Sequence, residues 1–125
     1  MMKSNEQVQV SLRSSFWNRF REVVCQEGIP YQWKALNDEV PDAAPSYCIR
    51  NFKAAAGMLD APHGGAVFQD SDLAKWIEAA AYTLVWKPDA ELEKTIDEAV
   101  ELVAAAQQAD GYLDTSFIIE RTQER

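Results

Sequence analysis

The sequence predicts an all-α protein built from antiparallel helical hairpins. Apolar residues recur at helical spacing in several segments, and no stretch alternates apolar and polar residues as a half-buried strand does. The clearest hairpin pairs a helix over residues 71–86 with a second helix over residues 89–109. Between them, Pro88 cannot continue the first helix and Asp89 is placed to cap the second.

The two helices of this hairpin differ in character. The first is apolar around most of its circumference, from Leu73 to Trp86, and such a helix is normally covered on nearly all sides. The second has one apolar stripe and otherwise carries acidic residues, and Gly111 is suited to the left-handed position that follows a helix. We therefore expect the first helix to be the more buried of the two.

The part of the chain before the hairpin contains shorter predicted helices. Residues 1–14 are expected to be a flexible lead-in and residues 15–125 to form the folded portion. A helix is predicted from Ser15 to about Gln26, with Gly28 ending it, and a short helical turn follows from Ile29.

The remaining segments complete the prediction of about five helical pieces. After a loop over residues 41–45, a helix is expected from about Ser46, with an apolar stripe that reaches Leu59 and a frayed end marked by Gly57 and Asp60. No convincing periodicity follows Thr115, so no helix is predicted there. Because helices of inner and outer character alternate, the sequence favours the opening part of a larger layered helical array over a small closed bundle.

Composition narrows the possible partners and locations. The chain has 125 residues, enough for one domain, and a formal net charge of −8, which argues against nucleic acid and anionic membranes as partners. It contains no apolar run long enough to span a membrane, and its first residues lack the apolar centre of a signal peptide. A cytoplasmic location is therefore expected.

The cysteines and the histidine do not suggest a metal centre. Cys25 and Cys48 lack metal-type spacing and are interpreted as buried free thiols in a reducing compartment. With His63 they would supply three separated ligands and no fourth, whereas structural zinc sites use four. No metal site is predicted in this chain.

Chain direction brings two acidic segments together. In an antiparallel hairpin the start of the first helix lies beside the end of the second, which places residues 68–72 next to residues 110–114. The candidate substrate-binding residues are those that would line a polar cleft with an aromatic wall at this end. They are Asp70, Asp72, Asp110 and Tyr112.

Each of these candidates also has a purely structural interpretation. Asp70 and Asp72 are either a carboxylate pair of the kind that glycosidases use, or a helix N-terminus with its capping residues. Asp110 and Tyr112 either contact a sugar, or shape a turn and pack against it.

An ordered series of motifs resembles the N-terminal part of the catalytic domain of glycoside hydrolase family 127, the beta-L-arabinofuranosidases. The resemblance extends from about Phe16 to Phe117. In chain order the residues that carry it are Ile29-Pro30-Tyr31-Gln32-Trp33, Asn37-Asp38-Glu39, Asn51-Phe52-Lys53, Ala55-Ala56-Gly57, Phe68-Gln69-Asp70-Ser71-Asp72, Lys75-Trp76, Glu78-Ala79, Ala106-Gln107-Gln108 and Asp110-Gly111-Tyr112-Leu113-Asp114-Thr115.

The resemblance implies an (α/α)6 barrel that removes non-reducing-end L-arabinofuranosyl residues. It also implies, for the full-length domain, a zinc-held cysteine nucleophile and a glutamate acid/base, both downstream of the matched segment. Cys25, Cys48 and His63 match none of these groups, so no catalytic residue is assigned here. The chain is expected to be an inactive fragment of such a hydrolase. The alternatives are a non-catalytic helical carbohydrate-binding or interaction module and a small structural bundle.

Overall fold

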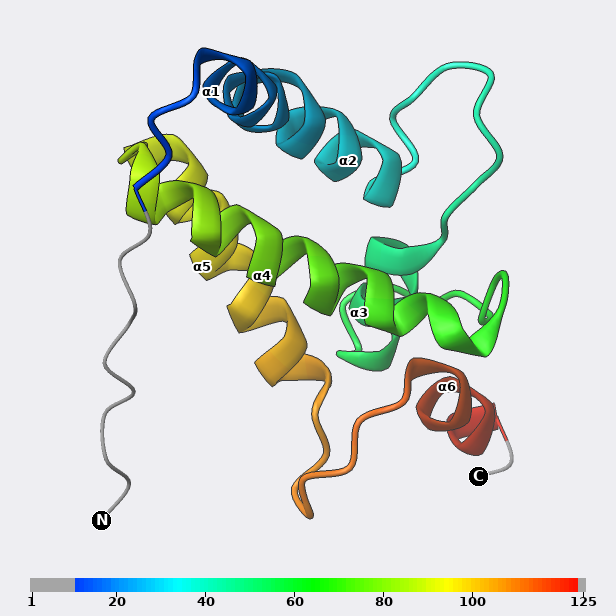
Figure 1. Ribbon diagram of the computed structural model, residues 1–125. Coiled ribbons are helices and arrows are strands. Elements are labelled where there is room, and N and C mark those ends of the chain that lie inside the picture. The colour runs from blue at the N-terminus through cyan, green and yellow to red at the C-terminus, as the bar shows by residue number, and fades with distance from the viewer. Residues whose placement is uncertain (1–10, 124–125) are drawn as a thin grey trace, which may run out of the picture.

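The computed structural model describes residues 11–123, and its regular elements in this range are all helices, joined by loops, with no strand among them (Figure 1). The elements are α1 (Ser15–Val23), a π-helical turn (Val24–Gly28), α2 (Ile29–Leu36), α3 (Cys48–Ala55), a 3-10 turn (Val67–Gln69), α4 (Asp70–Trp86), α5 (Ala90–Ala106) and α6 (Thr115–Gln123). The all-α prediction is confirmed. Most of the predicted lead-in lies outside the described residues, and residues 11–14 form no regular element.

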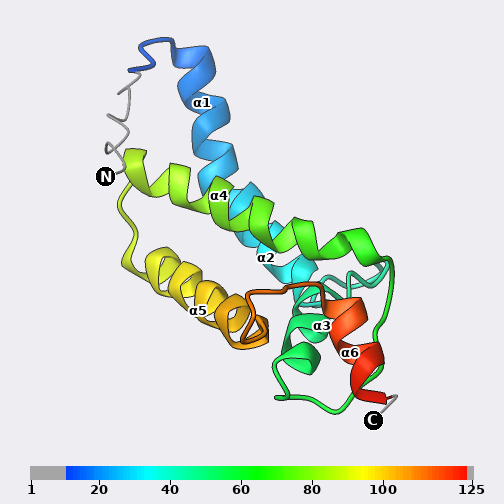
Figure 2. The ribbon, with the colours of Figure 1, turned by 90° about the horizontal axis from the view of Figure 1, so that it is seen from below.

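The predicted hairpin is present. α4 and α5 run antiparallel and pack against each other along one side (Figures 1 and 2). Between them Asp89 caps α5, since its Oδ1 accepts hydrogen bonds from the backbone N–H groups of Glu91 and Leu92 at 3.0 and 3.1 Å. The sequence therefore placed both helices correctly to within a few residues.

The hydrophobic core lies where α2, α3 and α5 meet α4. Trp76 of α4 is only 5% exposed, and its ring centroid lies 4.4 Å from that of Trp33 on α2. The indole N–H of Trp76 donates to the backbone carbonyl of Ile29 at 3.0 Å. The other buried side chains of the core come from the same four helices: Ile29, Leu36, Cys48, Ile49, Phe52, Leu73, Ala80, Ile96, Ala99 and Ala106.

The expectation that α4 is covered on nearly all sides is wrong. Tyr82 and Val85 are each 66% exposed, and α4 buries three residues, as does α5. The predicted contrast in burial between the two helices is therefore not seen. The reason is that α2, α3 and α5 leave one side of α4 without a neighbour among the described residues (Figure 2).

The prediction that Gly28 ends a helix is also wrong. Gly28 has helical dihedrals of −63° and −53°, and the helix continues through it into α2. Here the N–H of Ile29 donates to the carbonyl of Val24, five residues earlier, which is the π-helical pattern. Pro30 lacks an N–H group, and in a regular α-helix its ring would clash with the carbonyl of Gln26. The widened turn accommodates the proline without breaking the helix.

Helix α6 was not predicted from the sequence. Asp114 starts this helix, since its Oδ1 accepts from the N–H of Phe117 at 3.2 Å and its carbonyl accepts from Ile118. Ile118 and Ile119 are buried, and α6 packs against α3. Two adjacent apolar residues give no helical period in so short a segment, so the stability of α6 comes from tertiary packing.

The helical conformation of Gly28 leads to a stability prediction. A β-carbon at Gly28 would meet nothing closer than the carbonyl of Val23 at 4.0 Å. Gly28→Ala is therefore expected to raise the free energy of unfolding by about 0.5–1 kcal/mol, because alanine loses less backbone entropy on folding. Urea denaturation of the two proteins measures this difference.

Gly57→Ala is the matched control. Gly57 lies just after the last residues of α3 at φ +73°, and the N–H of Met58 donates to Lys53, which completes a Schellman ending. Alanine is strained in this conformation, so Gly57→Ala is expected to cost roughly 1 kcal/mol or more. A loss of stability in Gly28→Ala would contradict the continuous helix.

Candidate functional site

Asp70 joins the start of α4 to the start of α6. One of its carboxylate oxygens accepts the backbone N–H of Thr115 and the other accepts the Thr115 hydroxyl, both at 2.7 Å. Thr115 is fully buried, and the two residues lie 45 positions apart in the sequence. The start of α4 therefore contacts Thr115, one residue beyond the segment 110–114 that was predicted to lie beside it.

The other candidate residues are placed differently. Asp72 lies on the first turn of α4 and forms an exposed ion pair with Lys75 at 3.3 Å. Asp110 accepts the backbone N–H of Tyr112 at 3.0 Å, within a turn in which Gly111 has φ +89°. Tyr112 is 39% exposed. In both views the turn of this loop lies apart from the start of α4 (Figures 1 and 2).

The carboxylates of Asp70 and Asp110 thus serve internal hydrogen bonds. For Asp110 the geometry is that of an Asx turn, in which the side chain accepts a backbone donor two residues on. For Asp70 the carboxylate satisfies two donors at the beginning of a helix, where negative charge is also favoured by the helix dipole.

The side chain of Asn51 fixes the loop that leads into α4 by hydrogen bonds. No role was predicted for this residue from the sequence. It is completely buried, its Nδ2 donates to the carbonyl of Gly64 at 2.8 Å, and its Oδ1 accepts from the N–H of Gly64 at 3.0 Å. The side chain of Gln69 then accepts from the N–H of Ala66 at 2.7 Å. Local patterning offered no clear signal for this role, because Asn51 lies outside the apolar stripe of the predicted helix, which is formed by Ile49, Phe52 and Ala56.

A cavity of about 340 Å³ lies between α2 and α4 and borders one candidate residue, Asp72. Its polar lining consists of Gln32, Ser46, Asp72 and Lys75, and Trp76 forms part of its apolar wall. The exposed part of this lining is mainly apolar, and two of its polar groups, Asp72 and Lys75, pair with each other.

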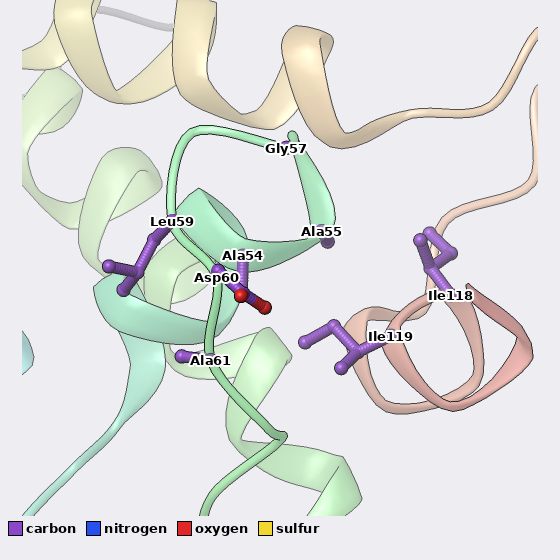
Figure 3. Close-up of a pocket in the computed structure, with 8 residues that line it drawn as sticks. All are labelled: Ala54, Ala55, Gly57, Leu59, Asp60, Ala61, Ile118 and Ile119. Atoms are coloured by element: carbon purple, nitrogen blue, oxygen red, sulfur yellow. The ribbon is translucent and has the colours of Figure 1, made fainter. Parts of the chain in front are cut away.

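A second cavity, of about 380 Å³, lies between the end of α3 and α6. Figure 3 shows Ile118 and Ile119 of α6 beside the turn that ends α3. Asp60 is the one charged residue in its lining, and the remaining residues are aliphatic or glycine. A single carboxylate does not by itself supply both the acid and the base that glycosidases use.

The zinc implied by the family resemblance does not fit the residues present. Burial raises the pKa of the Cys48 thiol to about 12, and this thiol donates to the carbonyl of Gln69 at 3.3 Å. Burial also raises the pKa of Cys25, whereas zinc binds thiolates. The Nε2 of His63 is buried without a hydrogen-bond partner, but among residues 11–123 no three His, Cys, Asp or Glu side chains gather in a metal-binding group.

Comparison with known proteins now gives the family. The beta-L-arabinofuranosidase GH127 catalytic domain matches residues 9–125, which is nearly the whole chain. The chain belongs to the GH127 beta-L-arabinofuranosidase family. A curated relative, the non-reducing end beta-L-arabinofuranosidase of Bifidobacterium longum subsp. longum, is 45% identical over 123 residues, covering 89% of this GH127 chain and 19% of that protein.

Two solved structures show the same helical arrangement. A GH127 beta-L-arabinofuranosidase from Geobacillus stearothermophilus T6 superposes with a TM-score of 0.87 at 54% identity, over 94% of this chain and 18% of that one. The GH127 beta-arabinofuranosidase BT3674 superposes with a TM-score of 0.76 at 32% identity, over 88% of this chain and 16% of that one. The GH127 chain thus spans about one fifth of these relatives and forms a partial (α/α) barrel.

The contact between Asp70 and Thr115 leads to a second stability prediction. In Asp70→Ala both acceptor oxygens are removed, which leaves the N–H and the hydroxyl of Thr115 without their partners. Because Thr115 is buried, we expect a loss of about 1–3 kcal/mol in the free energy of unfolding. Asp72→Ala is the control, since its exposed ion pair contributes at most about 1 kcal/mol. Equal stability of the two variants would show that the Asp70 contact is not formed.

The buried thiol of Cys48 predicts an alkaline loss of stability. Its pKa lies above the ordinary value of 9.0, so from about pH 9 to about pH 12 the folded chain keeps a proton that the unfolded chain releases. The stabilisation is complete below pH 9 and then falls by about 1.4 kcal/mol per pH unit as pH rises. Urea denaturation between pH 8 and pH 11 measures this slope.

Cys48→Ala removes this thiol and should flatten the slope, even though the variant is expected to be less stable than the wild-type chain at pH 8. Cys25→Ala is the matched control, because Cys25 is only partly buried and its removal should leave most of the slope. An identical pH dependence in the wild-type chain and Cys48→Ala would contradict the assignment.

Proposed function

We propose that this chain is part of a glycoside hydrolase that removes non-reducing-end L-arabinofuranosyl residues, and that it supplies helical framework rather than catalytic groups. The observation that carries the proposal is the 45% identity to a non-reducing end beta-L-arabinofuranosidase, which extends over 89% of this chain. Identity at this level over 89% of the chain indicates common descent of the whole segment rather than a shared local motif.

The framework role is supported by the state of the reactive groups. A nucleophilic cysteine needs a lowered pKa, whereas both thiols here have raised pKa values. Acid/base chemistry needs two carboxyl groups that face one substrate, whereas Asp70 and Asp110 accept hydrogen bonds from their own chain. Zinc and the catalytic residues of the complete domain are therefore proposed to come from other parts of that domain.

Carbohydrate contact is proposed for the remaining candidates. Asp72 borders the 340 Å³ cavity together with Gln32, Ser46 and Lys75, and side chains of these types bind sugar hydroxyls. Tyr112 has the exposure needed to stack on a sugar ring. The cavity also supports a second candidate function, that of a non-catalytic carbohydrate-binding module.

A cytoplasmic location is proposed as well. Both cysteines of the chain are free in the structure, which agrees with a reducing compartment. Among the described residues no helix is both long and apolar enough to cross a membrane.

The purified chain should not hydrolyse an aryl beta-L-arabinofuranoside, with or without added zinc, because it lacks an activated nucleophile. Release of the aryl group, followed spectrophotometrically, and metal analysis of the purified chain measure both properties. Turnover that Asp72→Asn abolishes would instead make the start of α4 catalytic and would overturn the framework role.

The positive test is a chimera in which this chain replaces the matched segment of the Geobacillus stearothermophilus relative. The chimera should hydrolyse the aryl beta-L-arabinofuranoside if the chain supplies an equivalent framework. A folded chimera without activity would contradict the proposed function. Saturable binding of L-arabinose to the chain alone, lost in Asp72→Asn, would favour the binding module.

A further inference from the structure

One side of α1 is strongly apolar and exposed. None of the residues of α1 is buried. Large apolar side chains on this helix and its flanks are between 40% and 59% exposed, whereas a soluble domain rarely leaves so many together in water. They are Leu12, Phe16, Trp17, Phe20, Val23 and Val24. We call this set the α1 face.

The α1 face is carried on a helix that is held in position. The Arg21 guanidinium lies 3.8 Å from the centroid of the Trp86 ring at the end of α4, and its Nη2 donates to the Oδ1 of Asn18 at 2.9 Å. Through the π-helical turn, α1 is also continuous with α2, which packs against α4 in the core. Figure 2 shows α1 extending from α2 beyond the other helices.

Three aromatic rings of the α1 face are already packed together. The ring centroids of Phe16 and Trp17 lie 5.1 Å apart in an edge arrangement, and those of Phe16 and Phe20 lie 4.8 Å apart. Aromatic clusters of this kind are the anchors of many protein interfaces, because they bury a large area and lose little conformational freedom. The α1 face is therefore suited to docking against another apolar helix.

We propose that the α1 face docks against further helical polypeptide of the GH127 domain, equivalent to the part of the relatives that this chain does not cover. The Geobacillus structure superposes on 94% of this chain, so α1 falls largely within the superposed region. This chain accounts for only 18% of that structure. The matched segment thus belongs there to a chain about five times as long, so that chain has ample further polypeptide that could cover this helix.

A second copy of the chain is a poorer occupant. Each chain carries a formal net charge of −8, so two copies repel each other as they approach. The outer side of α4 also exposes apolar groups, at Tyr82 and Val85, away from the core. One larger partner covers both surfaces, whereas a two-fold dimer through α1 leaves the α4 surface exposed.

The inference rests on the proposed function, because the proposed occupant of the α1 face is the remainder of the same glycosidase domain.

The test compares the rate of thiol labelling of Phe20→Cys in the chain alone and in the chimera with the Geobacillus relative. Peptide mass mapping distinguishes labelling of the new cysteine from labelling of Cys25 and Cys48. In the chimera the new cysteine should react at least about tenfold more slowly than in the isolated chain. Lys94→Cys, on the exposed side of α5, is the control and should react at similar rates in both.

The possible outcomes separate the two proposals. If the chimera hydrolyses the arabinofuranoside while Phe20→Cys reacts at the rate of the free chain, docking is overturned and the function stands. If the cysteine is protected in a folded chimera without activity, docking stands and the function fails. Should the chimera not fold, the cysteine is placed at the aligned position of the Geobacillus protein itself, where rapid labelling would overturn docking.

Analytical ultracentrifugation of the isolated chain tests whether a second copy of the chain covers the α1 face. The wild-type chain should sediment as a monomer, as should Phe20→Asp. A wild-type dimer that Phe20→Asp dissociates would assign the α1 face to a second copy and overturn the proposal. Met58→Asp is the control for an exposed apolar residue elsewhere, since Met58 is 63% exposed beyond the end of α3.

Discussion

The arrangement of the helices depends on the indole of Trp76. A buried N–H group must find an acceptor, and here the acceptor is the backbone carbonyl of Ile29, 47 residues earlier. This bond, with the packing of Trp33 on the same ring, fixes α2 against α4. Because α1 continues from α2 without a break, the same constraint also sets where α1 and its apolar side lie.

A second constraint concerns the candidate site. Asp70 uses both carboxylate oxygens on Thr115, so one member of the carboxylate pair that suggested acid/base chemistry in the sequence instead joins the beginnings of two helices. The loop before α4 is fixed in a similar way by the buried amide of Asn51. These bonds give the start of α4 a defined position, which suits a framework on which other parts of a GH127 domain assemble.

Local signals in the sequence were sufficient to predict helix boundaries where the deciding interactions span only a few residues. Pro88 and Asp89 fixed the break between α4 and α5, because a missing N–H and a capping carboxylate act within one turn. These signals were insufficient at Gly28, where the sequence suggests the end of a helix. In the structure the helix continues, because a π-helical turn accommodates Pro30. They also failed at α6, whose start is held by a residue 45 positions away.

The sequence by itself determined the helical class, the hairpin and, through its ordered motifs, the GH127 family, because each depends on residue order and short-range spacing. The tertiary structure decided which polar groups are already satisfied and which apolar surfaces remain open. Asp70 and Asp72 look alike in the sequence, but one is bonded to Thr115 and the other pairs with Lys75 beside a cavity. That difference arises from contacts between distant segments, which local residue patterns do not encode.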